Sequence, residues 1–109
     1  PAAVMTSYNL INGIHAANNG WLCTVIARKE WGFGGVIMSD WNTTVPQDAS
    51  VAWKCAAAGN DIIMPGNEAD AQDIRQAYAR GGLTEESIRS CAGRVMTLVE
   101  KCMAEKVEQ

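Results

Sequence analysis

Asp40 is the residue of this chain best placed for chemistry. It ends the apolar run Val36 to Ser39, which two glycines precede, and such a run predicts a short buried parallel strand. In parallel α/β folds the chemistry lies at the carboxyl ends of the strands, so a carboxylate there is a candidate nucleophile or base. Trp41 follows directly, and its flat ring suits the apolar face of a sugar. The alternatives are that Asp40 caps the next segment or pairs with a buried cation, and that Trp41 only packs.

Tyr8 is the second candidate, because it ends a β-prone run that begins near residue 3. It precedes Asp40 by 32 residues, which is the length of one strand, helix and strand unit. Neighbouring parallel strands lie about 4.8 Å apart, so side chains at equivalent strand ends can meet. A phenol that meets a carboxylate can donate a hydrogen bond to it and hold its orientation. The alternative is a strand-end aromatic ring that packs on its neighbour.

The remaining reactive side chains argue against a metal site or a cofactor. His15 is the only histidine, which leaves no histidine cluster for a metal and no plausible Ser-His-Asp set. The four cysteines form no Cys-x-x-Cys pair, so we expect buried free thiols. On one helix Cys91 and Cys102 would lie roughly 16 Å apart, too far for a disulfide. Free thiols fit a reducing compartment such as the bacterial cytoplasm.

The composition is that of one ordinary globular domain. The chain has 109 residues, of which 48% are hydrophobic and 19% charged. The net charge is only -3 and the basic residues are scattered, so we expect neither a nucleic-acid partner nor an anionic membrane. No apolar run approaches the roughly 20 residues that span a bilayer. The chain starts at Pro1 and enters strand sequence almost at once, as a piece of a longer protein would.

The order of elements predicts an α/β fold made of about three parallel β/α units and a long C-terminal helix. Strand starts recur every 25 to 33 residues, which is typical of such units rather than of hairpins. A (β/α)8 barrel of ~250 residues spends about 30 on each unit, so this chain is a partial barrel and too short to close. The expected strands are 3–8, 36–39 and 61–64, and the expected helices are 21–31, 48–59, 68–80 and a last one from 85.

Helical spacing also predicts which side chains face inward. In the first helix these include Trp21 and Val25, and in the third they include Tyr78. Asp61 begins its strand instead of ending it, so we expect it at the end of the sheet that serves stability. Thr84 should cap the last helix. The apolar stripe of that helix, which needs a partner surface, is Ile88, Cys91, Ala92, Val95, Met96, Val99, Cys102 and Met103.

Three sequence blocks together resemble glycoside hydrolase family 3, the β-glucosidases and related exo-acting enzymes. The first is Val4-Met5-Thr6-Ser7-Tyr8-Asn9 followed by Asn12-Gly13. The second is Glu30-Trp31-Gly32-Phe33, which leads through Gly35 into Val36-Ile37-Met38-Ser39-Asp40-Trp41. The third is Ala58-Gly59-Asn60-Asp61 with Met64-Pro65-Gly66. The spacing between the blocks also matches, so the resemblance covers nearly the whole chain.

This resemblance implies that residues 1–109 are the last part of the family's N-terminal barrel domain, roughly strands six to eight. Asp40 then matches the catalytic nucleophile, Tyr8 the tyrosine beside it, and Trp41 a residue of the sugar subsite. The implied activity is retaining hydrolysis of terminal β-linked glucosides or related glycosides, through a covalent glycosyl-Asp intermediate.

The same resemblance shows what this chain lacks. The sugar-binding residues that the family places on earlier strands are absent, and so is the second domain that usually supplies the acid/base. Glu68 is the best remaining acid, although solvated acids at helix starts are commoner. We therefore expect these 109 residues to be inactive alone and to need further segments as partners. The competing hypothesis is a non-catalytic α/β fragment or scaffold that self-associates.

Overall fold

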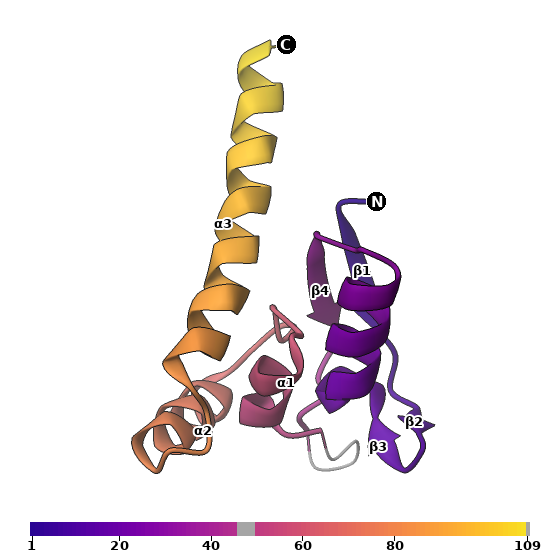
Figure 1. The fold of residues 1–109 in the computed structure, drawn as a ribbon. Helices are drawn as coiled ribbons and strands as arrows, with labels where there is room; N and C mark the ends of the chain where they lie inside the picture. The colour runs from indigo at the N-terminus through magenta and orange to yellow at the C-terminus, as the bar shows by residue number, and fades with distance from the viewer. Residues whose placement is uncertain (46–49, 109) are drawn as a thin grey trace.

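Two parallel strands form the centre of the fold, which a computed structural model describes for residues 1–45 and 50–108 (Figure 1). Strand β1 (Ala3–Thr6) pairs with β4 (Val36–Ser39), with Ala3 opposite Val36 and Thr6 opposite Ser39. The apolar run of β4 explains its central place, because Val36 and Ile37 are almost completely buried. The predicted parallel pairing of these two strands is confirmed.

The third predicted strand, 61–64, is wrong as a strand. The structure has a single parallel bridge between Met38 and Ile62 instead. The Ser39 N–H donates to the Ile62 carbonyl at 2.9 Å, but the Met64 N–H then turns to the Ser39 hydroxyl. Because a side chain takes this donor, the regular ladder of main-chain bonds stops after one bridge. The segment nevertheless runs parallel to β4, as expected.

A small hairpin follows β1. Strands β2 (Leu10–Ile11) and β3 (Ile14–His15) pair in antiparallel fashion. Asn12 and Gly13 between them have φ of 52° and 79°, the positive values that a two-residue hairpin turn requires. The short 3-10 helix η1 (Ala16–Asn18) then leads toward the first long helix.

The first long helix, η2 (Trp21–Glu30), is wider than an α-helix. It has π-helical geometry, and the Trp31 N–H that ends it donates to the Ile26 carbonyl, five residues back. The inward placement predicted for Trp21 and Val25 is wrong, because they are 54% and 37% exposed. Cys23 and Ala27, which are also four residues apart, face the sheet instead.

Two shorter helices pack on each other. Helix α1 (Ala52–Ala58) ends at Gly59, whose φ is 94°, and the predicted start of this helix at Asp48 lies outside the described residues. Helix α2 (Glu68–Ala79) begins where the Asn67 side chain accepts from the Asp70 N–H. The inward placement predicted for Tyr78 is wrong, since α2 buries Ala77 while Tyr78 stays 51% exposed.

Helix α3 (Glu85–Glu108) is the longest element and extends beyond the rest of the molecule (Figure 1). Thr84 caps it as predicted, because its hydroxyl accepts from the Ser87 N–H at 3.1 Å. Its apolar stripe is covered only at the start. Cys91 is 8% exposed, whereas Met96, Val99 and Met103 are 62%, 51% and 64% exposed. Within residues 1–45 and 50–108, no helix combines the length and apolar character needed to cross a bilayer.

Candidate active site

Asp40 and Tyr8 lie together at the carboxyl ends of the two paired strands. Asp40 directly follows β4, and its N–H donates to the carbonyl of Thr6, the last residue of β1, at 3.1 Å. Tyr8 lies two residues beyond β1, and its hydroxyl donates to the Trp41 carbonyl at 2.6 Å. The three residues predicted from the sequence are therefore neighbours in space.

None of the three is buried in helix packing. Asp40 is half-buried, whereas Tyr8 and Trp41 are 42% and 57% exposed. The expected phenol donor is present, but the acceptor seen here is the main-chain carbonyl of Trp41. Tyr8 thus holds the backbone next to the carboxylate, and both rings remain open to a ligand.

Two successive peptide groups, Asp40-Trp41 and Trp41-Asn42, each have both their carbonyl and their N–H in hydrogen bonds. The Asp40 carbonyl accepts from the Ser39 hydroxyl at 3.0 Å, and the Trp41 N–H of the same peptide donates to Asp40 Oδ1 at 2.7 Å. In the next peptide the Trp41 carbonyl accepts from Tyr8, and the Asn42 N–H donates to the Met64 carbonyl at 2.8 Å. The backbone behind the carboxylate is therefore tied to its own strand end and to two other segments, those of Tyr8 and Met64.

The chain turns sharply immediately after these peptides. Asn42 has a φ of 59°, a left-handed conformation that asparagine tolerates better than most residues. Its carbonyl accepts from the Val45 N–H at 3.0 Å, which closes the turn. This turn keeps the exposed Trp41 ring beside the strand end instead of letting the chain run on.

His15 has a structural contact in this region that the sequence did not indicate. Its Nδ1 lies 2.9 Å from the Tyr8 carbonyl, so the imidazole is joined to the main chain of the tyrosine. The signal that could have found it is the hairpin turn at Asn12-Gly13, which folds His15 back toward the end of β1. The ring helps to fix Tyr8.

Glu68, the best remaining acid by sequence, faces a cation. Its Oε1 lies 3.3 Å from Arg75 Nη1, and both side chains are more than two-thirds exposed. This is a solvated ion pair on the first turns of α2, the ordinary arrangement for an acid at a helix start. Its role as an acid stays a prediction.

The Asp61 side chain, in contrast, is completely buried at the other end of β4. Its Oδ2 accepts from Arg28 Nη2 at 2.8 Å and from the Ile37 N–H at 3.0 Å, and its Oδ1 accepts from Arg94 Nε at 2.8 Å. Burial lowers the pKa of Arg28 from its ordinary value, and the charge of Asp61 opposes that effect. Asp61 is thus the carboxylate that pairs with buried cations, and its predicted structural position is confirmed.

The thiols lie away from this chemistry. Cys23, Cys55 and Cys91 are buried and free, and burial raises the pKa of each, to about 11, 12 and 11. Cys102 is also free but exposed, so the expectation that it is buried is wrong; it lies on the uncovered part of α3. In the part of the chain that the structure describes, no three His, Cys, Asp or Glu side chains gather as metal ligands would.

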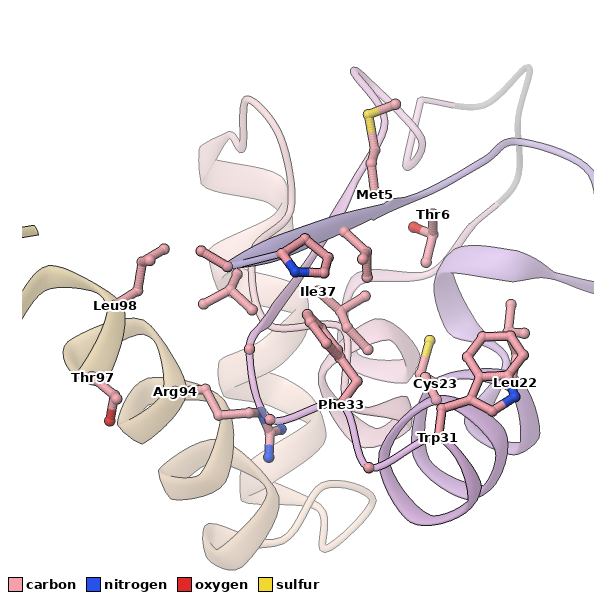
Figure 2. A pocket seen from close by; sticks show the side chains of 18 of the residues that line it. Met5, Thr6, Leu22, Cys23, Trp31, Phe33, Ile37, Arg94, Thr97 and Leu98 are labelled. Atoms are coloured by element: carbon pink, nitrogen blue, oxygen red, sulfur yellow. The ribbon is translucent and has the colours of Figure 1, made fainter. Parts of the chain in front are cut away.

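A large apolar cavity lies beside the strands, between β1, β4, η2 and α3 (Figure 2). It measures about 790 Å³. Asp40, Tyr8 and Trp41 are not among its lining residues, which include Met5, Leu22, Phe33, Ile37 and Leu98. The cavity is therefore separate from the candidate site. It marks a side of the sheet that residues 1–45 and 50–108 leave uncovered.

The family of this chain follows from its match to a family model. The model of the glycosyl hydrolase family 3 N terminal domain matches residues 1–98. This chain belongs to glycosyl hydrolase family 3. The sequence resemblance is thereby confirmed, and it covers all of the small α/β unit described above except the last turns of α3.

Relatives of this family 3 chain are considerably longer proteins. A β-glucosidase of Rhizobium radiobacter is 38% identical over 91% of this chain and 12% of its own length. An exo-alpha-(1->6)-L-arabinopyranosidase of Bifidobacterium breve is 39% identical over 95% of this chain and 13% of its own length. This chain therefore spans about one eighth of the length of these curated relatives.

Solved structures of the family share the fold. β-Glucosidase 3B of Thermotoga neapolitana, solved in complex with glucose, matches with a TM-score of 0.81 and 33% identity over 91% of this chain and 14% of that one. A family 3 β-glucosidase of Bifidobacterium adolescentis matches with a TM-score of 0.81 and 35% identity, over 95% and 14%. The parallel strands and their helices thus have the arrangement found in family 3 β-glucosidases.

Proposed function

We propose that Asp40 is the nucleophile of a retaining glycoside hydrolase. Its carboxylate attacks the anomeric carbon and forms a covalent glycosyl-Asp intermediate, which water then hydrolyses. The proposed substrates are terminal β-linked glucosides or related glycosides, in line with the names of the relatives.

The observation that carries this proposal is the setting of the Asp40 carboxylate. It lies at the carboxyl end of a parallel strand, half-buried, with Oδ1 bound by the Trp41 N–H at 2.7 Å. That bond limits rotation of the carboxylate and makes Oδ2 the attacking oxygen. The exposed Trp41 ring beside it offers a face for the sugar, and Tyr8 keeps the Trp41 backbone in place.

The proposed domain role is that of the last part of a (β/α)8 barrel. In it β1, β4 and the segment at Ile62 correspond to strands six to eight. A retaining site needs a second carboxyl about 5 to 5.5 Å from the nucleophile, and Glu68 is engaged by Arg75. The acid/base and further sugar contacts would come from other segments of a longer protein, so residues 1–109 alone should not turn over substrate.

The test is Asp40→Ala in the full-length protein that contains these residues. Turnover should be nearly abolished, because the change removes the covalent route and not a single contact. Mass spectrometry after treatment with a slow-turnover 2-fluoroglycoside should find the adduct on the peptide that holds Asp40. Glu68→Gln serves as the matched control and should still be labelled there. An adduct on Glu68 or outside residues 1–109, with Asp40 unmodified, would overturn the proposal.

A second candidate is a non-catalytic unit that self-associates. The observation in its favour is the exposed apolar stripe of α3, with Met96, Val99 and Met103 each more than half exposed. The function would then be association itself, and Asp40→Ala would leave it unchanged.

A further inference from the structure

We propose that Ser39 is a positioning residue for Asp40, because its hydroxyl fixes the peptide group whose N–H holds the nucleophilic carboxylate. The inference rests on the proposed role of Asp40. It adds a residue outside the Tyr8, Asp40 and Trp41 set, and it assigns a task to the buried side chain at the last position of β4.

The Ser39 hydroxyl has both of its hydrogen-bonding functions in use. Ser39 is 1% exposed, so water does not compete for it. Its Oγ accepts from the Met64 N–H at 2.9 Å and donates to the Asp40 carbonyl at 3.0 Å. A hydroxyl has one proton to donate, and because the Met64 N–H fills one acceptor site, that proton points away from Met64 and has the Asp40 carbonyl as its partner. The hydroxyl is therefore locked toward the Asp40 carbonyl.

Planarity of the peptide bond transmits this constraint to the carboxylate. The Asp40 carbonyl and the Trp41 N–H belong to one rigid plane, so a group that fixes the first also fixes the direction of the second. The Trp41 N–H donates to Asp40 Oδ1 at 2.7 Å. Without the Ser39 hydroxyl the carbonyl end of this plane would lose its bond, and the Trp41 N–H would hold the carboxylate from a less firmly fixed peptide group.

Ser39 places a polar side chain at a buried position of β4, where an apolar one would be usual. Alternate residues of a strand face the same side, so Ser39 points to the same side as Ile37, which is 1% exposed. An apolar side chain would be the simplest choice in such a buried layer, since a buried hydroxyl is tolerated only when its hydrogen bonds are made. Here both are made, and one of them is to the residue that we propose as nucleophile.

The test compares three substitutions in the full-length protein. Ser39→Ala removes the hydroxyl, and Ser39→Thr keeps it. Thr24→Val is the matched control, because it removes a hydroxyl that also donates to a carbonyl, that of Ala58 at 2.7 Å. Thr24 lies on η2 next to Gly59, at the end of the sheet where Asp61 is buried, and has no part in the site. The measurement is the rate constant of covalent labelling by a 2-fluoroglycoside at saturation, with its half-saturating concentration and the melting temperature.

Ser39→Ala should slow labelling roughly 10- to 100-fold, the cost of a misplaced attacking group. The half-saturating concentration should stay unchanged, because binding of the sugar does not involve Ser39. Thr24→Val should lower the melting temperature without slowing the labelling, and Ser39→Thr should restore most of the rate. Rescue by the hydroxyl would not be expected of a residue that only fills space.

Two results would overturn the inference. One is labelling of Ser39→Ala at the rate of the unaltered protein. The other is a folded Ser39→Thr variant that is labelled as slowly as Ser39→Ala. If Ser39→Thr does not fold, the comparison of Ser39→Ala with Thr24→Val decides alone. Failure of the proposed function is distinct, because Asp40→Ala would then still be labelled.

Discussion

Removal of the buried carboxylate of Asp61 should strongly destabilise this chain. Asp61→Ala deletes the acceptor of two guanidinium groups and of the Ile37 N–H. The Arg28 side chain is only 12% exposed, so it would remain buried without a counter-charge. Breaking a buried ion pair in this way costs about 3–5 kcal/mol. That is a large share of the roughly 5–15 kcal/mol by which whole domains are stable.

The partner substitution should cost less, and the difference is informative. Arg94→Met removes one charge-assisted bond, typically about 1.5–3 kcal/mol. Since the Arg94 side chain is 23% exposed, the lower end of that range is expected. Asp61 would keep Arg28 and the Ile37 N–H. The double substitution should cost less than the sum of the two, because both remove the same contact.

The assay is urea unfolding of the 109-residue chain, followed by tryptophan fluorescence at one fixed protein concentration, since association also stabilises by mass action. Glu85→Ala is the matched control. It breaks the Arg89 to Glu85 pair, whose side chains are 78% and 61% exposed, and should cost no more than about 0.5 kcal/mol. If Asp61→Ala costs no more than Glu85→Ala, the argument from burial and pairing is refuted.

Two further predictions concern stability against pH and association. Burial raises the pKa of Cys55 from 9.0 to about 12, so the folded chain holds this proton more tightly than the unfolded chain does. Its contribution to stability is therefore complete below pH 9.0 and is lost as the pH rises toward 12. Cys55→Ala should make the urea midpoint fall less steeply in that range. An equally steep fall would contradict the raised pKa of Cys55. The chain alone should also self-associate in light scattering, and Val99→Glu should reduce the association whereas Ser90→Glu on the same helix should not. A stable, cooperative monomer of the unaltered chain would count against that prediction.

The sequence was sufficient to predict that Tyr8 and Asp40 would lie together. Both end apolar runs, and parallel strands bring equivalent ends to one edge, so the strand pattern alone determines their proximity. The same reasoning places Asp61 at the opposite end of the strands, because Asp61 begins its segment instead of ending it. These predictions needed only the direction of each strand.

What the sequence could not indicate depends on side chains that compete with the main chain. The segment 61–64 has the composition of a strand, yet the Ser39 hydroxyl takes the Met64 N–H and the ladder stops at Ile62. The inward placement of Trp21 failed because two faces of η2 carry apolar residues at the same spacing, and the face with the smaller side chains Cys23 and Ala27 is the buried one. The amino-acid composition indicates neither the hydrogen bond between Ser39 and Met64 nor the face of η2 that is buried.

The exposed sulfur-containing side chains make this chain sensitive to oxidants. Met5 on β1 and Met96 and Met103 on α3 are each more than half exposed, and the exposed Cys102 lies on the same part of α3 as Met103. Oxidation of a methionine gives a polar sulfoxide, which opposes later burial of the surface that carries it. Peroxide damage would therefore matter most while these side chains are exposed. The extent of sulfoxide at each position then gives a direct chemical measure of how far that surface has been covered.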